Sequence, residues 1–263
     1  MGLVDWYLGT IGFSYKDWEG IFYPAGLPAR SYLAYYSEIF NAVELDSTFY
    51  GTPPTDRVTQ WSSATPPNFK FCVKTPRQIT HDLRLVQAKK AMADFIDTIS
   101  LFDDKLGAVL IQLPPSLTSA QIDTVSAFLA ELPGGFRYAV EFRHHSWFTA
   151  GTAALLETYR IGWVSVDYVG LPKQITQTAD FLYLRWLGRH GQFKRHDQEQ
   201  QDVTAQLEYW VAELQPYLDR AETIYGFFNN DYAGHSPATS NQFKQLIGLP
   251  VNSPQTPQQE RLF

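Results

Sequence analysis

Several apolar runs in this sequence end in charged side chains, where a strand would give way to a loop. The clearest is "YAVEFRHHSW" at 138–147, which leads into Glu141, Arg143, His144 and His145. Charged groups are costly to bury unless they are paired or bind a ligand. The run therefore marks a candidate site, in which Glu141 would act as a general base beside an arginine.

Other apolar runs end in the same way. Side chains on a strand alternate between its two faces, so Glu44 shares a face with Asp46, and Cys72 with Lys74. In an extended backbone, His144 and His145 would point to opposite sides. We predict Glu141, Glu44 and Lys74 as catalytic residues. The predicted substrate-binding residues are Arg143, Arg185, Gln112, Asp46, Asn229, Asn230, His190, Trp147 (folded over the rim of the site) and Tyr50.

Eight strand-like runs alternate with amphipathic segments along the chain. A strict alternation predicts parallel strands joined by crossovers, and eight units in 263 residues predict the α/β class, as a single (β/α)8 TIM-type barrel. An open doubly wound sheet is the alternative, although its glycine-rich turn is incomplete here. The expected strands are 5–11, 42–48, 69–75, 107–113, 138–143, 163–167, 181–187 and 224–230.

The barrel is expected to occupy residues 1–250, followed by a Pro- and Gln-rich tail at 251–263. The longest helical pattern covers 84–102, whereas 168–180 reads as a loop or a poor helix. Active sites of such barrels lie at the carboxyl ends of the strands, where the predicted residues fall.

Composition limits the classes of function. The net charge of -6 does not favour nucleic acid as a partner. Cys72 is the single cysteine, so no internal disulfide forms and a reducing interior is expected. No run approaches the ~20 apolar residues of a membrane span, and no signal peptide is recognisable. We therefore expect a cytoplasmic protein without membrane contact; the sequence does not indicate an oligomeric state.

Six segments in order resemble the motifs of the YecE-like family, domain of unknown function seventy-two. They are "LGTIGFSYKDWEGIFYP", "VELDSTFYGTP", "FKFCVKTPRQITH", "LIQLPPSL", "AVEFRHHSW" and "FFNNDYAGHSP". The resemblance runs from about residue 6 to about residue 248 and implies a TIM-type barrel, without implying a reaction. Phe13 stands where Trp is usual, and Asp46 stands where Asn is usual. "LRWLGRHG" departs from the family's shorter form, which leaves the match of His190 open.

The first functional hypothesis is binding or hydrolysis of an anionic, phosphate-bearing substrate at the mouth of the barrel. Lys74, Arg143 and Arg185 would supply positive charge, and the loops "GRHGQFKRH" and "NNDYAGHSP" would add a basic cluster and a helix start at Ser236. A hydrolase of the phosphoester type is favoured over a glycosidase. The cofactor is unknown. A divalent metal is possible as an alternative but is not indicated, because lysine and arginine would repel it.

Two alternatives stay open. The first is a carbohydrate-active hydrolase that uses Glu44 and Glu141 as its two carboxyl groups. Strands two and five are well separated around a barrel, and basic residues suit an anion better than a neutral sugar. The second is a non-catalytic barrel that binds a metabolite without reacting with it.

Overall fold

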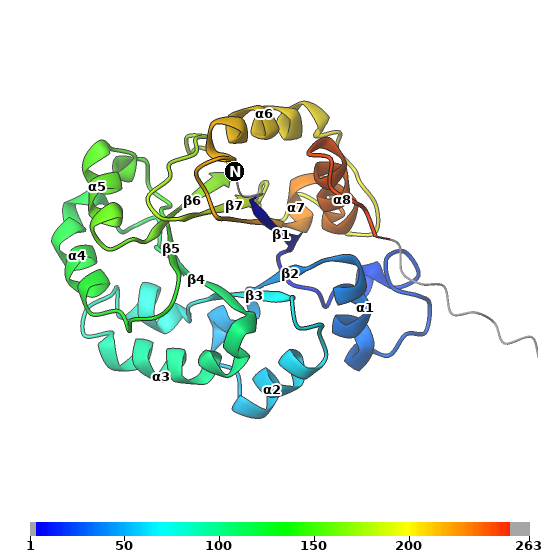
Figure 1. Cartoon of the computed structure of the whole chain (residues 1–263), viewed down its shortest axis with the longest axis horizontal. Helices are drawn as coiled ribbons and strands as arrows, with labels where there is room; N and C mark the ends of the chain where they lie inside the picture. The colour runs from blue at the N-terminus through cyan, green and yellow to red at the C-terminus, as the bar shows by residue number, and fades with distance from the viewer. Residues whose placement is uncertain (1–3, 253–263) are drawn as a thin grey trace, which may run out of the picture.

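Eight parallel strands surrounded by helices form the computed structural model, which describes residues 4–252 (Figure 1). The strands neighbour one another in the order β1-β8-β7-β6-β5-β4-β3-β2. This confirms the predicted (β/α)8 barrel; of the expected tail, residues 253–263 lie outside the described residues. The strands are β1 (Asp5–Thr10), β2 (Ala42–Leu45), β3 (Lys70–Lys74), β4 (Leu106–Gln112), β5 (Tyr138–Glu141), β6 (Gly162–Asp167), β7 (Phe181–Trp186) and β8 (Thr223–Phe228).

Side chains help to close the barrel between β1 and β2. The amide of Asn41 donates a hydrogen bond to the carbonyl of Trp6 at 2.7 Å, and the Tyr36 hydroxyl donates to the carbonyl of Ala42 at 3.0 Å. At the carboxyl ends of the two strands, the carbonyl of Glu44 accepts a hydrogen bond from the amide of residue 12 at 2.8 Å. The barrel is therefore nearly closed, and the backbone at Glu44 is fixed on both sides.

Helices cover the outside of the strands, and one of them differs from the sequence pattern. The helix expected at 84–102 begins only at Lys89, because Arg84, Leu85 and Gln87 adopt the left-handed backbone region, which cannot continue a helix. Residues 168–180 form no helix, in agreement with the weak pattern there. The helices are α1 (Tyr32–Ile39), α2 (Thr55–Ser63), α3 (Lys89–Ile99), α4 (Ile122–Ala130), α5 (Ala150–Thr158), α6 (Thr204–Leu214), α7 (Asn230–Ala233) and α8 (Ser236–Leu246).

Single-turn helices occupy many of the connections. The chain after β3 forms a π-helical turn at Gln78–Asp82. The remaining turns are of the 3₁₀ type: Lys16–Trp18, Ala29–Ser31, Ser47–Tyr50, Ser100–Lys105, Ser119–Gln121, His145–Trp147 and Gln215–Tyr217.

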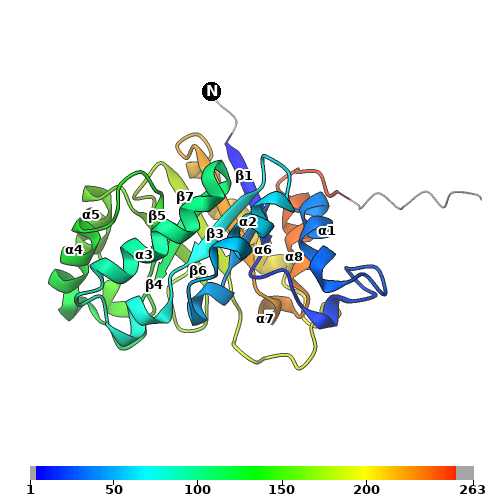
Figure 2. The same ribbon diagram turned by 90° about the horizontal axis from the view of Figure 1, so that it is seen from below.

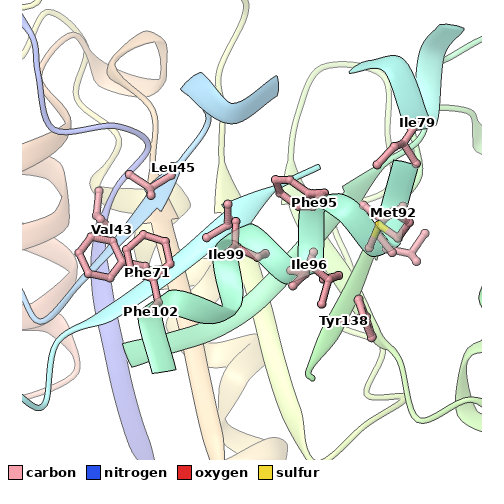
Figure 3. Close-up of a cluster of buried hydrophobic side chains, with 14 of the residues drawn as sticks. Val43, Leu45, Phe71, Ile79, Met92, Phe95, Ile96, Ile99, Phe102 and Tyr138 are labelled. Carbon is pink, nitrogen blue, oxygen red and sulfur yellow. The ribbon is translucent and has the colours of Figure 1, made fainter. Parts of the chain in front are cut away.

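Apolar side chains on the outer faces of the strands form the main core with the helices (Figure 3). Val43 and Phe71 from neighbouring strands are fully buried there, beside Phe102, whose ring stacks on Phe71 with centroids 4.3 Å apart. Met92 and Ile96 present the apolar stripe of α3 to the same core. This burial anchors the strands and so fixes the residues on their other face.

The inner face carries small and apolar residues below a polar layer. Ala42, Cys72 and Ala139 fill the lower interior, and burial raises the pKa of the Cys72 thiol. Two residues further along the same strands and on the same face come Glu44, Lys74 and Glu141, as alternation requires. The polar layer therefore lies at the carboxyl ends of the strands.

The carboxyl ends form the mouth of the barrel. Figure 2 shows the long loop after β7 and helix α7 on the side of the barrel opposite the start of β1. Within residues 4–252, no helix has the length and apolar character needed to cross a membrane.

Candidate active site at the mouth of the barrel

Arg185 of β7 joins two carboxylates at the mouth. Its Nη2 lies 2.6 Å from Oε1 of Glu44 and its Nε lies 2.9 Å from Oε2 of the same residue. Its Nη1 donates to Oε2 of Glu141. The Tyr183 hydroxyl adds a hydrogen bond to Oε2 of Glu44 at 2.8 Å. All four side chains are buried, and buried charges persist only when they are paired in this way.

The second carboxylate, Glu141, is held from two sides. Arg143 Nε donates to its Oε1, while Arg185 occupies its Oε2. Burial alone would raise the pKa of Glu141, but the two guanidinium groups lower it to about 2. Burial raises the pKa of Glu44, and the fork of Arg185 opposes that rise. Each of the four carboxylate oxygens accepts at least one hydrogen bond from a side chain of the protein. Both glutamates therefore bind partners within the protein in this arrangement.

These contacts revise an expectation about the charged residues. Strands β2 and β5 are separated by β3 and β4, as expected, but a single guanidinium in the interior contacts carboxylates from both. Arg185, expected to contact substrate, is 3 % exposed and has both carboxylates as partners. We therefore describe Glu44, Glu141, Arg185 and Arg143 as the buried charge network.

Arg143 is the member of this network nearest to solvent. Its side chain is 15 % exposed, and its guanidinium lies 4.4 Å from the ring centroid of Tyr168. Only its Nε forms a hydrogen bond with the residues between 4 and 252, so its terminal nitrogens keep their donors. Arginine offers such donors in a planar fork that fits phosphate or carboxylate.

Lys74 lies next to the network without a carboxylate partner. Its Nζ is 4.2 Å from the ring centroid of Phe49, and within the described part of the chain it forms neither an ion pair nor a hydrogen bond. Burial and the nearby charge of Arg185 lower the pKa of Lys74 to about 8. His81 packs edge-on against Phe49, and burial and Lys74 lower its pKa as well.

Asp46 is a carboxylate at the mouth that remains partly exposed. Burial raises the pKa of Asp46, and the charge of Lys74 opposes the rise. Asp46 also lines a cleft of about 740 Å³ between the first two βα units, together with Tyr50, which is 83 % exposed. The cleft lies beside the buried charge network and shares Asp46 with the mouth. Gln112, at the end of β4, is buried next to Glu141 in register.

Acidic residues form a hydrogen bond and an ion pair with the basic loop after β7. Asp231 Oδ2 accepts a hydrogen bond from the amide of Gly191 at 2.9 Å, and Arg195 pairs with Asp197 at 2.6 Å. Gly188 has a positive φ, and a Cβ there would lie 2.1 Å from the carbonyl of Asp231, so only glycine fits this approach. His190 is 98 % exposed, with its Nδ1 3.6 Å from Asp231. Acidic partners therefore balance part of the charge that suggested an anion site.

The predicted helix start at Ser236 is confirmed. The amide and hydroxyl donors of Ser236 already form hydrogen bonds within the protein. The side-chain oxygen of Asn230 accepts hydrogen bonds from the amide and hydroxyl of Ser236 at 3.0 and 2.8 Å, and from Trp18 Nε1 at 3.3 Å. Asn229 caps α7 through the amide of Asp231 at 2.8 Å. Both asparagines thus organise the turn between β8 and α8.

The end of the segment 138–147 differs from its predicted layout. Trp147 is fully buried, and its Nε1 donates to the carbonyl of Leu117 at 2.7 Å, so it lies in the core rather than at the rim. The rings of His144 and His145 stack with centroids 4.3 Å apart. Alternation does not apply to them, because strand β5 ends at Glu141 and the chain turns away.

Two neighbours of the network were not predicted from the sequence. Tyr183 lies two residues before Arg185 on β7, and this spacing places both side chains on the inner face. Tyr168 follows β6 directly and forms a platform for Arg143. The spacing of Tyr183 was a usable signal, whereas the position of Tyr168 in a loop gave none.

The site offers no arranged set of metal ligands. Among residues 4–252, no group of three or more His, Cys, Asp or Glu side chains is placed to hold a metal ion. The open groups at the mouth are instead Lys74, Arg143 and Asp46, of which two are cations.

Comparison with known proteins places this chain in a family. The family model "Protein of unknown function DUF72" matches residues 7–261. The chain is 30% identical over 145 residues to the UPF0759 protein YecE of Escherichia coli K12, a match to 55% of this chain and 51% of YecE, so it spans about half the length of that relative. The UPF0759 protein YunF of Bacillus subtilis is 25% identical over 278 residues, covering 92% of this chain and 95% of YunF.

Solved structures show the same fold. A DUF72 family protein from Thermotoga maritima is 31% identical with a TM-score of 0.78, covering 92% of this chain and 99% of that chain. A DUF72 family protein from Enterococcus faecalis is 20% identical with a TM-score of 0.76, covering 94% and 99%. The second likeness concerns the fold alone.

Proposed function

Since this chain belongs to the DUF72 family of proteins of unknown function, we propose from the site itself that it binds a small, phosphate-bearing anion at the mouth of the barrel. Lys74 and Arg143 contact the anion in this proposal. The buried charge network positions Arg143, and Asp46 lies at the edge of the bound molecule.

The observation that carries the proposal is that the Lys74 ammonium has no direct partner among residues 4–252, where it forms no hydrogen bond and no carboxylate lies within 4.0 Å of it. The guanidinium groups of Arg185 and Arg143 lower its pKa, and the carboxylates of Glu141 and Glu44, which are already paired with those arginines, raise it. An anion between Lys74 and Arg143 would give both cations a direct partner in a poorly solvated site, where charge interactions are strong.

A phosphate ester suits the two cations better than a neutral sugar. Phosphate presents several acceptor oxygens and close to two negative charges, which match a lysine point charge and an arginine fork. The carbohydrate alternative needs Glu44 and Glu141 as acid and base, yet their oxygens are occupied by donors from Arg185, Arg143 and Tyr183.

The test is the stabilisation of the folded protein by glycerol 3-phosphate, measured as the rise in its thermal unfolding midpoint. Wild type should show a saturable rise. Lys74→Met and Arg143→Lys should each weaken binding about ten- to a hundredfold, since a charge-assisted hydrogen bond contributes about 1.5–3 kcal/mol. Arg137→Met, which removes a cation at the opposite end of the barrel, should bind as wild type does. Equal stabilisation of all four proteins would contradict the proposal.

A further inference from the structure

We propose that Lys74 is a nucleophile that forms an imine with the carbonyl group of a small anionic aldehyde or ketone bound at the mouth of the barrel. This rests on the proposed function, because the anionic group of the same molecule is the part that Arg143 holds. In this inference Lys74 forms the covalent bond, and Arg143 holds the anionic group.

The position of Lys74 supports a covalent role. The side chain is only partly buried, so a small molecule can reach it, and its amine is not engaged by any hydrogen-bond acceptor of the described chain. Lys105 shows the contrasting arrangement. Burial also lowers the pKa of Lys105, but its Nζ donates to the carbonyls of Ser62 and Thr65 at 2.6 and 2.7 Å. Lys105 is therefore held as a structural cation, whereas Lys74 is available.

The surroundings of Lys74 increase the share of its neutral, nucleophilic form. Burial and the guanidinium groups of Arg185 and Arg143 outweigh the opposing carboxylates of Glu141 and Glu44, and the pKa of Lys74 falls to about 8. At pH 7 the neutral fraction of such an amine exceeds that of a lysine with the ordinary pKa by roughly two orders of magnitude. Lysines activated by desolvation and neighbouring cations form Schiff bases with carbonyl compounds.

The step is balanced without an oxidant or a metal. The neutral Nζ attacks the carbonyl carbon and forms a C–N bond, and the carbonyl oxygen becomes a hydroxyl. As the C=N bond forms, this oxygen leaves as water and carries away the two hydrogens of the amine. Asp46, whose carboxylate senses the charge of Lys74, is the group that would take one of these hydrogens from the nitrogen as a proton and pass it to the departing oxygen, so that its own protonation state is restored.

The experiment is reductive trapping of the full chain by sodium cyanoborohydride with dihydroxyacetone phosphate, followed by peptide mass mapping. Hydride would convert the imine to a stable secondary amine. We expect the adduct on Lys74, formed at least about tenfold faster than on Lys105 or the exposed lysines, with a rate that rises with pH around 8. Lys74→Met should abolish this adduct, and Lys105→Arg should retain it.

Two comparisons separate this inference from the proposed function. If glycerol 3-phosphate stabilises the protein but no adduct forms selectively on Lys74, the imine inference is overturned and anion binding stands. If Lys74 reacts equally fast with dihydroxyacetone and with its phosphate, the lysine is a nucleophile but the phosphate-binding proposal fails. Uniform labelling of all lysines overturns the inference directly.

Discussion

The two ends of the barrel each hold an arginine between two carboxylates, but in different surroundings. At the mouth, Arg185 is 3 % exposed and its partners Glu44 and Glu141 are fully buried. At the opposite end, Arg137 is 33 % exposed, with Asp180 and Glu222 each 3.3 Å away and largely in solvent. The ion pairs of Arg137 are therefore surface contacts that solvent screens. The ion pairs of Arg185 join charges that are removed from water.

The difference shows which arginine the fold depends on. Exposed ion pairs contribute about 0–1 kcal/mol, because water and salt screen them. In a buried pair each charge depends on the other, and removal of one partner leaves an uncompensated charge. Changing one member of the buried charge network therefore leaves another member unpaired, and Lys74 lies beside this network with no carboxylate within 4.0 Å among residues 4–252.

The largest expected effect comes from Arg185→Met. This change leaves the buried Glu44 without its cation and Glu141 with Arg143 alone, so we expect a loss of about 3–5 kcal/mol in the free energy of unfolding. The matched change at the other end, Arg137→Met, should cost no more than about 1 kcal/mol. Urea denaturation of both variants at pH 7 measures the contrast. Similar losses would show that burial does not distinguish the two arginines.

A smaller effect is expected in the acid stability of the protein. The folded pKa of Glu141, about 2, lies below the unfolded value of about 4.3, so its contribution is complete above about pH 5 and is lost as the pH falls toward 2. Glu141→Gln should remove this dependence, of about 2–3 kcal/mol, from the stability curve between pH 5 and 2. A curve that keeps the wild-type slope would assign the dependence to other carboxylates.

The smallest effect should have the opposite sign. Lys74→Met removes a cation that the folded state holds at a lowered pKa, so we expect the variant to be more stable at pH 7 by about 0.5–2 kcal/mol. The gain should shrink between pH 8 and about 10.4, as the lysine of the wild type becomes neutral in both states. Urea denaturation at pH 7 and pH 10 measures this. Destabilisation at pH 7 would identify Lys74 as a structural residue.

Much of the architecture was predictable because the periodicity of the strands is local information. The alternation that places Glu44 with Ala42 and Glu141 with Ala139 follows from a period of two and from the apolar opposite face. The helix boundary at Lys89 was not predictable in this way. It depends on the left-handed backbone of Leu85, which is buried in the tertiary structure.

The partners of the charged residues were harder to predict than their positions. The sequence places Arg185 at the end of a strand but does not specify which carboxylates lie within reach of its guanidinium across the barrel. The basic residues after β7 suggested an anion site because their acidic partners, such as Asp231, come from a different βα unit. Ion pairs between residues of different βα units form only when the barrel closes, and no local sequence pattern specifies them.

A calorimetric titration of glycerol 3-phosphate into wild type, Lys74→Met and Arg137→Met, at the same pH and salt concentration, tests the role of Lys74 most directly. We predict saturable binding to wild type and to Arg137→Met, and loss of binding in Lys74→Met while that variant unfolds at an equal or higher urea concentration. Unchanged affinity in a folded Lys74→Met would contradict the claim that the unpaired lysine at the mouth receives the anion.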